Sequence, residues 1–516
     1  MVLRTASRLV VSFAITSRSA RSLSTTSSAI SRLNDPSLLE WNKASSSALP
    51  SFSVFDPASS GTVLADVQSV DAAEAILKSK DALGSWRDDT TASFRSACLS
   101  EWSRLVKSNI EDLATIMTLE SGKPLAESRG EVNYAASFLD YYAAEAIRPS
   151  GAGGGFMVPS PFATPSGGPK GNVLAVQQAV GVCALISPWN FPMAMITRKA
   201  GPALAAGCTA VVKPSELTPL SAIALENLAK QAGIPSDVFQ VVTASTEETP
   251  SVGELLATSP HIQKLSFTGS TRVGKLLMKQ SSETVKRLSL ELGGNAPFVV
   301  FEDADIDQAV DAAMASKFRN AGQTCVCADR FLVHSSVHDI FVEKLVKKTK
   351  AIKVGAGMEA GTSMGPLISL QAADSVSKKV RAAIEGGATC ELGGNRLNGQ
   401  FFEPTVLVNV STESDIWKTE TFGPVAPIVK FETEEEALAI ANDAPVGLAS
   451  YFCTKDLSRV FRFSNSLESG LVGVNEGIIS SCVAPFGGVK ESGLGREGSH
   501  LGLAEYLETK YIFINS

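Results

Sequence analysis

The sequence predicts an α/β protein built around a doubly wound, largely parallel sheet. Beyond about residue 180, short apolar strands alternate with helical segments, which is typical of parallel strands joined by crossover helices. A second strand–helix series runs from about residue 295 to about 480. The chain has 516 residues, too many for one compact core, so we expect two or three domains.

The N-terminal segment, residues 1–34, differs in composition from the rest of the chain. It holds five arginines and nine serines, and Asp35 is the first acidic residue. Apolar residues are interspersed among the arginines, as in an amphipathic helix with a basic face. This pattern is typical of a mitochondrial transit peptide and predicts a protein of the mitochondrial matrix. A plastid address and a disordered basic tail are the alternatives.

The expected elements follow in order along the chain. Residues 64–148 are expected to be mostly helical, because apolar side chains recur there at three- and four-residue spacing. Residues 149–171 are rich in Gly, Pro and Ser and predict an exposed excursion. A helix is expected at 217–232. The strands expected in this part lie in GVCALISP, TAVVKPS, VFQVVTA and IQKLSFTGS.

Two segments of the first series could bind a nucleotide. In FTGSTRVGK a strand ends and a helix begins, with Gly269 at the turn and Gly274 one helical turn later, and backbone N–H groups there can hold a pyrophosphate. A plain strand–helix turn is an equal alternative. In VVKPSE, Lys213 and Glu216 lie just beyond a strand's carboxyl end, where open α/β sheets bind ligands. The alternative there is a solvated charge pair.

Composition and charge exclude several classes of protein. The net charge is −7, which argues against a general nucleic-acid binder, and no run reaches the ~18 apolar residues of a membrane span. Eight scattered cysteines do not form a disulfide framework. His334 and His338 lack the glutamate of a zinc-binding HExxH motif, so no metal site is expected.

Seven short strings occur in order and together resemble the NAD(P)-dependent aldehyde dehydrogenase superfamily. The resemblance covers nearly everything after residue 35, apart from 149–171, which is longer and richer in glycine than the pattern. More narrowly, AMITRK, KFRNAGQTCVC and NEGIISS resemble the succinate-semialdehyde dehydrogenases of that superfamily. The seven strings are SPWNFP, VVKPSE, FTGS, LELGGNAP, NAGQTCVC, ETFGP and PFGGVKESGLGRE.

The resemblance implies a subunit in three parts that assembles into a homodimer or homotetramer. The Rossmann-type cofactor domain would comprise residues 35–164, 187–291 and 485–500. An α/β catalytic domain would comprise residues 292–484. A small β arm for oligomerisation would comprise residues 165–186 and 501–516.

The resemblance also assigns the catalytic residues. Oxidising an aldehyde requires a nucleophile that makes the carbon tetrahedral, and a cysteine thiolate suits this because its thioester product is reactive. Cys325 occupies that place, near a turn whose N–H dipoles could lower its pKa. Asn190 and the backbone N–H of Cys325 would stabilise the alkoxide. Glu291, placed among apolar residues, would activate water against the thioester.

The cofactor expected from the resemblance is NAD, with NADP as the alternative. A carboxylate at Glu216 could accept both ribose hydroxyls of the adenosine and would repel a 2′-phosphate. The other residues that the resemblance places around the cofactor are Trp189, Lys213, Gly269, Ser270, Gly274, Leu292, Glu420 and Phe422.

For the substrate, the resemblance implies a short aldehyde that carries a carboxylate at its far end. Arg198 and Arg319 would hold that carboxylate, because a guanidinium binds it bidentately, and Ser480 would donate a hydroxyl. The alternative for each arginine is a structural salt bridge. Succinate semialdehyde is the expected substrate, with glutarate semialdehyde or a broad range of aliphatic aldehydes as alternatives.

The pair Cys325–Val326–Cys327 suggests a further possibility. In an extended segment, residues i and i+2 lie ~6.6 Å apart at Cα, at the upper edge of what a disulfide spans. A strained bond is readily reduced, so Cys327 could be a resolving thiol that reversibly blocks the nucleophile. The alternatives are a small core residue at Cys327 and, from a different class of protein, a thiol redox sensor.

Overall fold

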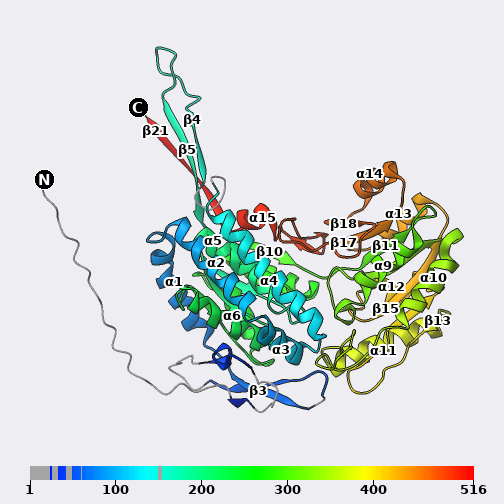
Figure 1. Cartoon of the computed structure of the whole chain (residues 1–516). Coiled ribbons are helices and arrows are strands. Elements are labelled where there is room, and N and C mark those ends of the chain that lie inside the picture. The colour runs from blue at the N-terminus through cyan, green and yellow to red at the C-terminus, as the bar shows by residue number, and fades with distance from the viewer. Residues whose placement is uncertain (1–23, 26–32, 42–48, 60, 149–153, 516) are drawn as a thin grey trace.

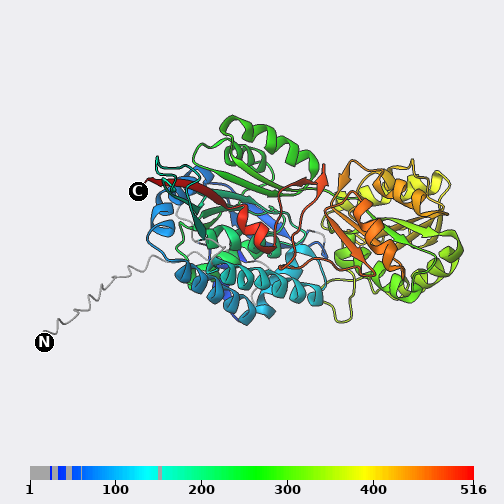
Figure 2. The same ribbon diagram turned by 90° about the horizontal axis from the view of Figure 1, so that it is seen from above.

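The computed structural model describes residues 24–25, 33–41, 49–59, 61–148 and 154–515. Figures 1 and 2 show two α/β bodies side by side, with a narrow sheet projecting from the larger one. The predicted α/β class is confirmed. Most of the predicted transit peptide, residues 1–34, lies outside the described residues. None of the described helices is both long and apolar enough to cross a membrane.

The larger body contains a six-stranded sheet with the strand order β20-β10-β9-β6-β7-β8. All neighbours in it are parallel except β10 and β20. The chain adds strands on one side of β6 and then crosses to the other side, so the order reverses between β6 and β9. The strands are β6 (Val182–Ile186), β7 (Thr209–Lys213), β8 (Phe239–Val241), β9 (Lys264–Thr268), β10 (Arg287–Glu291) and β20 (Gly493–Leu494).

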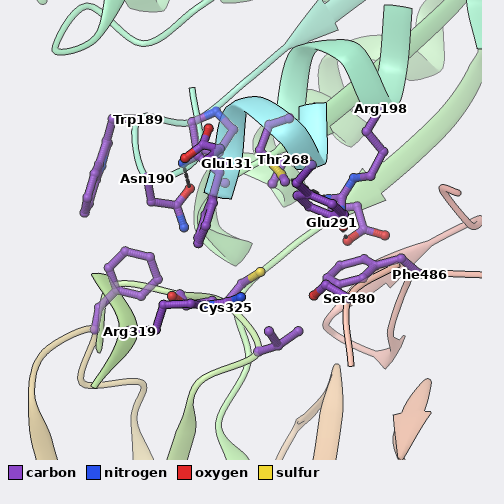
Figure 3. A pocket seen from close by; sticks show the side chains of 18 of the residues that line it. Glu131, Trp189, Asn190, Arg198, Thr268, Glu291, Arg319, Cys325, Ser480 and Phe486 are labelled. Carbon is purple, nitrogen blue, oxygen red and sulfur yellow. Dashed lines mark hydrogen bonds and ion pairs between the residues drawn. The ribbon is translucent and has the colours of Figure 1, made fainter. Parts of the chain in front are cut away.

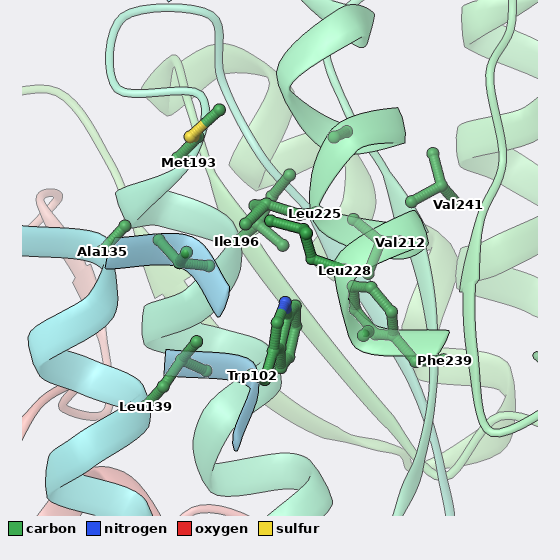
Figure 4. Close-up of a cluster of buried hydrophobic side chains, with 14 of the residues drawn as sticks. Trp102, Ala135, Leu139, Met193, Ile196, Val212, Leu225, Leu228, Phe239 and Val241 are labelled. Atoms are coloured by element: carbon green, nitrogen blue, oxygen red, sulfur yellow. The ribbon is translucent and has the colours of Figure 1, made fainter. Parts of the chain in front are cut away.

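Helices cover both faces of this sheet. Trp102 packs against Phe239 with ring centroids 5.0 Å apart, in a core of buried aliphatic side chains that joins the N-terminal helices to the sheet (Figure 4). The helices are α1 (Ala72–Arg87), α2 (Ala92–Ser108), α3 (Ile110–Ser121), α4 (Leu125–Ala146), α5 (Ala194–Ala206), α6 (Pro219–Gln231), α7 (Thr249–Thr258), α8 (Thr271–Ser281) and α15 (Ser499–Ala504).

The smaller body contains a seven-stranded sheet with the order β13-β14-β15-β12-β11-β17-β18. Only β13 is antiparallel to its neighbour. The strands are β11 (Ala296–Val300), β12 (Ala328–His334), β13 (Thr389–Leu392), β14 (Thr405–Val408), β15 (Val425–Phe431), β17 (Ala449–Cys453) and β18 (Leu471–Val474). The helices are α9 (Ile306–Lys317), η4 (Arg319–Gly322), α10 (Ser335–Thr349), α11 (Leu370–Glu385), α12 (Asp415–Lys418), α13 (Glu434–Asn442) and α14 (Leu457–Ser466).

The projecting sheet has three antiparallel strands, β4 (Gly155–Pro159), β5 (Gly171–Ala179) and β21 (Leu507–Asn515). The last strand pairs with β5 along its whole length, from Leu507 opposite Ala179 to Asn515 opposite Gly171. These residues differ from the range 165–186 expected for the arm. The sheet already begins within the Gly/Pro-rich excursion, and 182–186 form β6 of the six-stranded sheet.

Short elements complete the described fold. A three-stranded sheet with the order β1-β3-β2 lies near the N-terminus, and β16 pairs with β19 close to the C-terminal part. Their bounds are β1 (Ser24–Thr25), η2 (Pro36–Leu39), β2 (Ser51–Phe55), β3 (Val63–Gln68), η3 (Ser282–Thr284), β16 (Val446–Gly447) and β19 (Val489–Lys490).

Candidate active site

A cavity of about 550 Å³ contains most of the residues predicted for the site (Figure 3). It opens where the strand order of the six-stranded sheet reverses, because β6 leads into Trp189 and Asn190 while β9 leads into Gly269. The predicted residues that line the cavity are Trp189, Asn190, Arg198, Gly269, Ser270, Glu291, Leu292, Arg319, Cys325, Glu420, Phe422 and Ser480. Lys213, Glu216, Gly274 and Cys327 are not among its lining residues.

Cys325 lies in a turn between η4 and β12, where the N–H of Cys327 donates to the carbonyl of Thr324 at 2.9 Å. The approach to this turn is strained, because Asn320 and Ala321 both have positive φ, at 50° and 53°. Gly322 follows with φ 74°, and a Cβ there would lie 2.1 Å from the carbonyl oxygen of Gly423. The tight backbone therefore fixes the position of Cys325, the predicted nucleophile.

The Cys325 thiol is held in its neutral form. Burial is the main cause that raises its pKa to about 12, and the carboxyls of Glu291 and Glu420 add to it, while Arg198 and Arg319 act in the opposite direction. The lowering by N–H dipoles that we expected from the sequence is therefore outweighed by burial. Forming a thiolate here requires a base.

Asn190 is buried and held by hydrogen bonds at both ends of its carboxamide. Its Oδ1 accepts from the N–H of Phe191 and its Nδ2 donates to the carbonyl of Gln323, both at 3.1 Å. The amide is therefore oriented, and Nδ2 retains a second hydrogen. In the view of Figure 3 the Cys325 sulfur lies between Asn190 and Glu291.

Glu291 ends strand β10 with a carboxyl that is only 3% exposed. Neither oxygen has a hydrogen-bond partner among the described residues. Burial, and then Glu497, raise its pKa to about 8, whereas Arg198, Lys199 and Arg496 lower it. A Cβ at Gly487 would lie 3.1 Å from Glu291 Oε1, so this glycine leaves room for the carboxyl. The group can take up a proton near neutral pH.

The two arginines differ in their surroundings. Arg198 is buried, with Nε 2.5 Å from Glu497 Oε2, so its charge is already paired. Arg319 is half-buried above the ring of Phe191, 5.3 Å from its centroid, and forms no ion pair with a described residue. Ser480 lines the same cavity. Of the two arginines predicted to bind a substrate carboxylate, Arg198 forms an ion pair with a described residue and Arg319 forms none.

The two residues predicted for the adenosine ribose lie outside the cavity. Lys213 Nζ is 3.3 Å from Glu216 Oε2, where β7 ends. Ser270 caps helix α8 by accepting from the N–H of Val273. A Cβ at Gly274 would lie 2.4 Å from Leu292 Cδ2, so Gly274 allows α8 to pack against the segment after β10.

At the inner end of the cavity, Gly294 bonds to the carboxyl of Glu420 and lies close to the backbone of Cys325. The N–H of Gly294 donates to Glu420 Oε1 at 3.3 Å, and burial raises the pKa of Glu420 to about 8. A Cβ at Gly294 would lie 2.5 Å from the carbonyl oxygen of Cys325. Phe422 packs edge-on against Trp189 at 5.5 Å. The opening beside Cys325 is therefore flanked by two aromatic rings and one carboxyl.

Cys327 is placed differently from the sequence expectation. Because residues 324–327 form a turn rather than an extended segment, the spacing assumed for a strained disulfide does not apply. The Cys327 thiol is buried and contacts the carbonyl of Lys317 at 3.3 Å. Burial raises its pKa to about 12. The two thiols of the pair thus have different surroundings.

The sequence reasoning missed a buried group that supports Asn190. Lys123 donates to the carbonyl of Asn190 at 2.6 Å and pairs with Glu131. Glu131 in turn accepts from the N–H groups of Met193 and Ala194, at the start of α5. Nothing in the local sequence marks Lys123 or Glu131, because the backbone groups of Asn190 and Met193 that they contact are 67 and 62 residues away. No cluster of three or more His, Cys, Asp or Glu side chains suited to a metal occurs in the described part of the chain.

Residues 41–512 match the sequence profile of the aldehyde dehydrogenase family. The chain belongs to this family. A mitochondrial succinate-semialdehyde dehydrogenase of Mus musculus is 52% identical over 467 residues, which cover 89% of this chain and 87% of the relative. A glutarate-semialdehyde dehydrogenase of Pseudomonas putida is 50% identical over 465 residues, which cover 90% of this chain and 94% of that enzyme.

Solved structures of family members have the same fold as this aldehyde dehydrogenase. An NADP-dependent enzyme of E. coli matches with a TM-score of 0.89 and 48% identity, covering 94% of this chain and 100% of that one. A betaine aldehyde dehydrogenase of Staphylococcus aureus in complex with NAD+ matches with a TM-score of 0.85 and 36% identity, covering 90% and 92%. The resemblance on which the sequence analysis relied is confirmed.

Proposed function

We propose that this aldehyde dehydrogenase oxidises succinate semialdehyde to succinate with NAD. The observation that carries the proposal is the half-buried guanidinium of Arg319, which forms no ion pair with a described residue and lies on the wall of the cavity that holds Cys325. A guanidinium without an ion-pair partner favours a substrate that brings its own carboxylate. Relatives that share about half of this sequence act, by name, on semialdehydes of this kind.

In the proposed reaction the Cys325 sulfur attacks the aldehyde carbon. Because burial raises the pKa of the thiol, the attack needs a proton acceptor, and Glu291 is the carboxyl beside it with a pKa of about 8. The carbonyl oxygen becomes an alkoxide, which the Nδ2 of Asn190 and the N–H of Cys325 would stabilise. Donors of this kind are worth about 3 kcal/mol each in a transition state.

The residues around the inner opening fit a dinucleotide. The start of α8 offers first-turn backbone N–H groups, although the N–H of Gly269 itself already donates to the carbonyl of Glu291, and the buried Glu420 carboxyl could accept from ribose hydroxyls. A nicotinamide cofactor, when bound, supplies the acceptor for the hydride that leaves the tetrahedral carbon. Lys213 and Glu216 would hold the adenosine ribose, and Glu216 favours NAD over NADP because its carboxylate repels a 2′-phosphate.

Loss of the hydride would leave a thioester on Cys325, which water must hydrolyse. Once the proton taken from the thiol has passed to solvent, Glu291, which has no hydrogen-bond partner among the described residues, can accept a proton from that water and return it to the departing Cys325 sulfur. The products would be the carboxylic acid and the free thiol. Arg319 and Ser480 would keep the far carboxylate in place throughout.

The proposal is tested by steady-state kinetics on succinate semialdehyde, glutarate semialdehyde and propanal, each with NAD and with NADP. We expect the highest kcat/KM for succinate semialdehyde with NAD, and we expect Arg319→Ala to raise KM for both semialdehydes far more than for propanal. Equal efficiency on propanal would contradict the narrow substrate, a preference for glutarate semialdehyde would support that alternative, and a preference for NADP would contradict the role of Glu216.

We further propose that the three-stranded sheet is an oligomerisation surface. It projects from the body (Figure 1) and exposes large apolar side chains, among them Phe156, Met157, Phe162 and Tyr511, each at least 60% exposed. A homodimer or homotetramer would bury them. Light scattering on the full chain and on a chain ending at residue 506 measures the assembly. A monomeric full chain would contradict the proposal.

The sequence also leads us to propose a mitochondrial matrix location and a redox switch. Fusing residues 1–34 to a fluorescent protein, with and without the five arginines changed to Gln, tests the first, and a cytosolic or plastid signal would contradict it.

For the redox switch to close, Cys327 would have to leave its contact with the Lys317 carbonyl. If Cys327→Ala leaves peroxide inactivation equally fast and equally reversible by dithiothreitol, Cys327 is a core residue only.

A further inference from the structure

The turn that carries Cys325 belongs to the smaller body and has an unusual backbone. Three consecutive residues before it, Asn320, Ala321 and Gly322, have positive φ of 50°, 53° and 74°. Glycine adopts this left-handed region readily, but an asparagine or an alanine is strained in it. Such a conformation persists only where its surroundings hold it in place. The contacts of this turn therefore decide where the thiol of Cys325 and the neighbouring Arg319 lie.

Side chains of the turn satisfy several of its polar groups but not the N–H of Asn320. Asn320 Nδ2 donates to the carbonyls of Asn190 and Gln323, both at 3.2 Å. Gln323 Nε2 donates to the carbonyl of Asn320 at 3.1 Å, and its Oε1 accepts from the N–H of Ile368 at 2.9 Å. The N–H of Asn320 donates instead to Glu127 Oε2 at 2.9 Å. This bond crosses from the smaller body to helix α4 of the larger one.

The corner that carries Glu127 packs tightly against the smaller body. It joins α3 to α4, and the N–H of Leu125 donates to the carbonyl of Gly357 in the smaller body at 3.0 Å. A Cβ at Gly365 would lie 2.1 Å from the carbonyl oxygen of Gly122, so no side chain fits between the two backbones there. Glu127 therefore reaches the turn from a fixed position.

The carboxyl of Glu127 lies in the wall of the cavity, together with Arg319 and Cys325. Figure 3 shows Arg319 and Cys325 on the same side of that cavity. Burial is the main cause that raises the pKa of Glu127, whereas Lys123, the N–H of Asn320 and Arg319 lower it. Glu127 thus has two possible effects on the site, one through its hydrogen bond to the turn and one through its charge.

We propose that Glu127 is a positioning residue for Cys325: through the N–H of Asn320 it holds the strained turn, and with it the nucleophile and Arg319, in the geometry that the reaction needs. The inference deepens the proposed function and rests on it in one respect, which is that Cys325 is the nucleophile. No motif in the sequence marks Glu127, because its partner lies 193 positions away along the chain.

Two substitutions separate the hydrogen bond from the charge. Glu127→Gln keeps an acceptor of the same reach without the charge, whereas Glu127→Asp keeps the charge but is one methylene too short for the bond. We expect kcat to fall at least about tenfold in Glu127→Asp and in Glu127→Ala, because a displaced nucleophile loses the geometry of attack. Glu127→Gln should stay within about threefold of wild type, since a neutral acceptor still bonds the N–H.

Steady-state kinetics on propanal and on succinate semialdehyde make this comparison. In Glu127→Asp and Glu127→Ala the loss in kcat should be the same for both aldehydes, and KM should rise for the semialdehyde alone, because Arg319 moves with the turn. The reverse order of variants, with Glu127→Asp active and Glu127→Gln impaired, would overturn the inference and assign Glu127 to the charge of Arg319.

Relief of the backbone strain provides an independent test in the same turn. Adding Ala321→Gly to Glu127→Ala removes the penalty of the left-handed backbone at one position and changes no polar group. We expect it to raise kcat at least about threefold in that background, while Ala321→Gly alone stays within about twofold of wild type. A double variant that is no more active than Glu127→Ala would overturn the inference, since the strain would then not need to be held.

Hydrogen exchange reports on the turn without catalysis. Mass spectrometry of the peptide that contains residues 320–325 should show exchange at least about tenfold faster in Glu127→Ala than in wild type or Glu127→Gln, because an amide that loses its hydrogen bond loses its protection. If Glu127→Ala does not fold, Glu127→Asp takes its place. Unchanged exchange would overturn the inference. If wild type oxidises no aldehyde while exchange changes as expected, the proposed function fails and Glu127 still holds the turn.

The matched control is Asp112→Ala on α3. Asp112 is also a buried carboxyl that accepts from backbone N–H groups, those of Asn34 at 3.1 Å and Asp35 at 2.7 Å, but it does not line the cavity. We expect Asp112→Ala to lower Tm and to leave both kcat and the exchange of residues 320–325 unchanged. An equal loss of kcat in Asp112→Ala would show that any buried carboxyl has this effect and would overturn the specific role of Glu127.

Discussion

At the scale of single residues, burial disfavours the charged forms of both the proposed nucleophile, Cys325, and the proposed base, Glu291. Burial raises the pKa of the Cys325 thiol to about 12 and that of the Glu291 carboxyl to about 8. Neither group carries its charge easily, because the same desolvation acts on both. Because Glu291 has the lower pKa, it is ionised at a pH at which the thiol is still neutral. In its ionised form it can take the proton of the thiol.

The reactivity of Cys325 toward an alkylating agent should follow from this. In the NAD-free protein we expect the rate of alkylation by iodoacetamide to rise steadily with pH up to at least pH 9, because only the thiolate reacts. Mass spectrometry of the peptide that contains Cys325 measures the rate. Cys327→Ser is the control and should give the same profile, since Cys327 is buried away from the cavity. A plateau below pH 8 would contradict the raised pKa.

Asn190→Ala should lower kcat by about 100- to 1000-fold, as expected for the loss of one donor to an alkoxide. Stability should fall by only about 1 kcal/mol for the lost hydrogen bond to the Gln323 carbonyl. Steady-state kinetics and Tm measure the two effects. The control is Asn227→Ala, which also removes hydrogen bonds to backbone carbonyls, those of Ser37, Leu38 and Glu40, but lies outside the cavity. It should leave kcat unchanged, and an equal loss in both variants would refute the role of Asn190.

At the scale of elements, the site depends on how closely three backbone segments approach one another. The glycines after β10 pass the nucleophile turn, and that turn meets the segment of Gly423 through Gly322. Each crossing leaves no space for a Cβ. The turn can therefore hold a strained backbone at Asn320 and Ala321, because the neighbouring segments confine it.

Gly294→Ala tests this close approach. The new methyl would lie 2.5 Å from the Cys325 carbonyl oxygen, so the nucleophile turn must shift, and we expect kcat to fall more than tenfold with about 1–3 kcal/mol of destabilisation. The control is Gly253→Ala on α7, where the nearest atom is at 3.8 Å and the helix should gain up to about 1 kcal/mol. Chemical denaturation and kinetics distinguish them. An unchanged kcat in Gly294→Ala would show that the turn can shift without loss of catalysis and would contradict this prediction.

At the scale of the whole molecule, buried carboxyls link stability to pH. Glu120, Glu291 and Glu420 each have a pKa raised by burial to about 8, against 4.5 for an ordinary glutamate. A carboxyl with a raised folded pKa binds its proton more tightly in the folded protein. Folding is therefore favoured at low pH, and stability is lost as the pH rises through about 8.

We expect Tm to fall by several degrees between pH 6 and pH 9, and we expect Glu291→Gln to reduce this slope by removing one of the three groups. Calorimetry across that range makes the measurement. At pH 9, Glu291→Gln should be more stable than wild type although it is less active. Such a stability–activity trade-off is common at active sites. A slope that is the same in wild type and variant would mean that Glu291 ionises at an ordinary pH.

The sequence was informative about the fold where apolar strands and helices alternate, and about the site where residues stand in short ordered strings. Asn190 follows strand β6, Glu291 ends β10 and Cys325 lies in the turn before β12, and all three line the same cavity. Partners distant along the chain could not be found in this way. The contacts of Lys123 with Asn190 and of Glu131 with Met193, and the Arg198–Glu497 pair, join segments whose approach is set by packing alone.

The same limit explains one feature that the sequence left open and one correction. The predicted exposure of the excursion at 149–171 is confirmed for strand β4, but its conformation was open, and β4 pairs with β5 because the partner strand supplies the hydrogen bonds. At Cys325–Val326–Cys327, the sequence cannot distinguish an extended segment from a turn. The hydrogen bond between Cys327 and Thr324 shows that the segment forms a turn, and no residue nearby in the sequence indicates this bond.

The edge strand β20 has a consequence for the order of events during synthesis. It pairs with β10 at Leu290 and Glu291, although the paired residues are 204 and 202 positions apart along the chain. The segment around it also brings in Gly487 and Glu497. Domains generally fold from the N-terminus as the chain emerges. In the larger body, the edge of β10 therefore stays unpaired until β20 has been synthesised. We expect a product that terminates before β20 to be inactive.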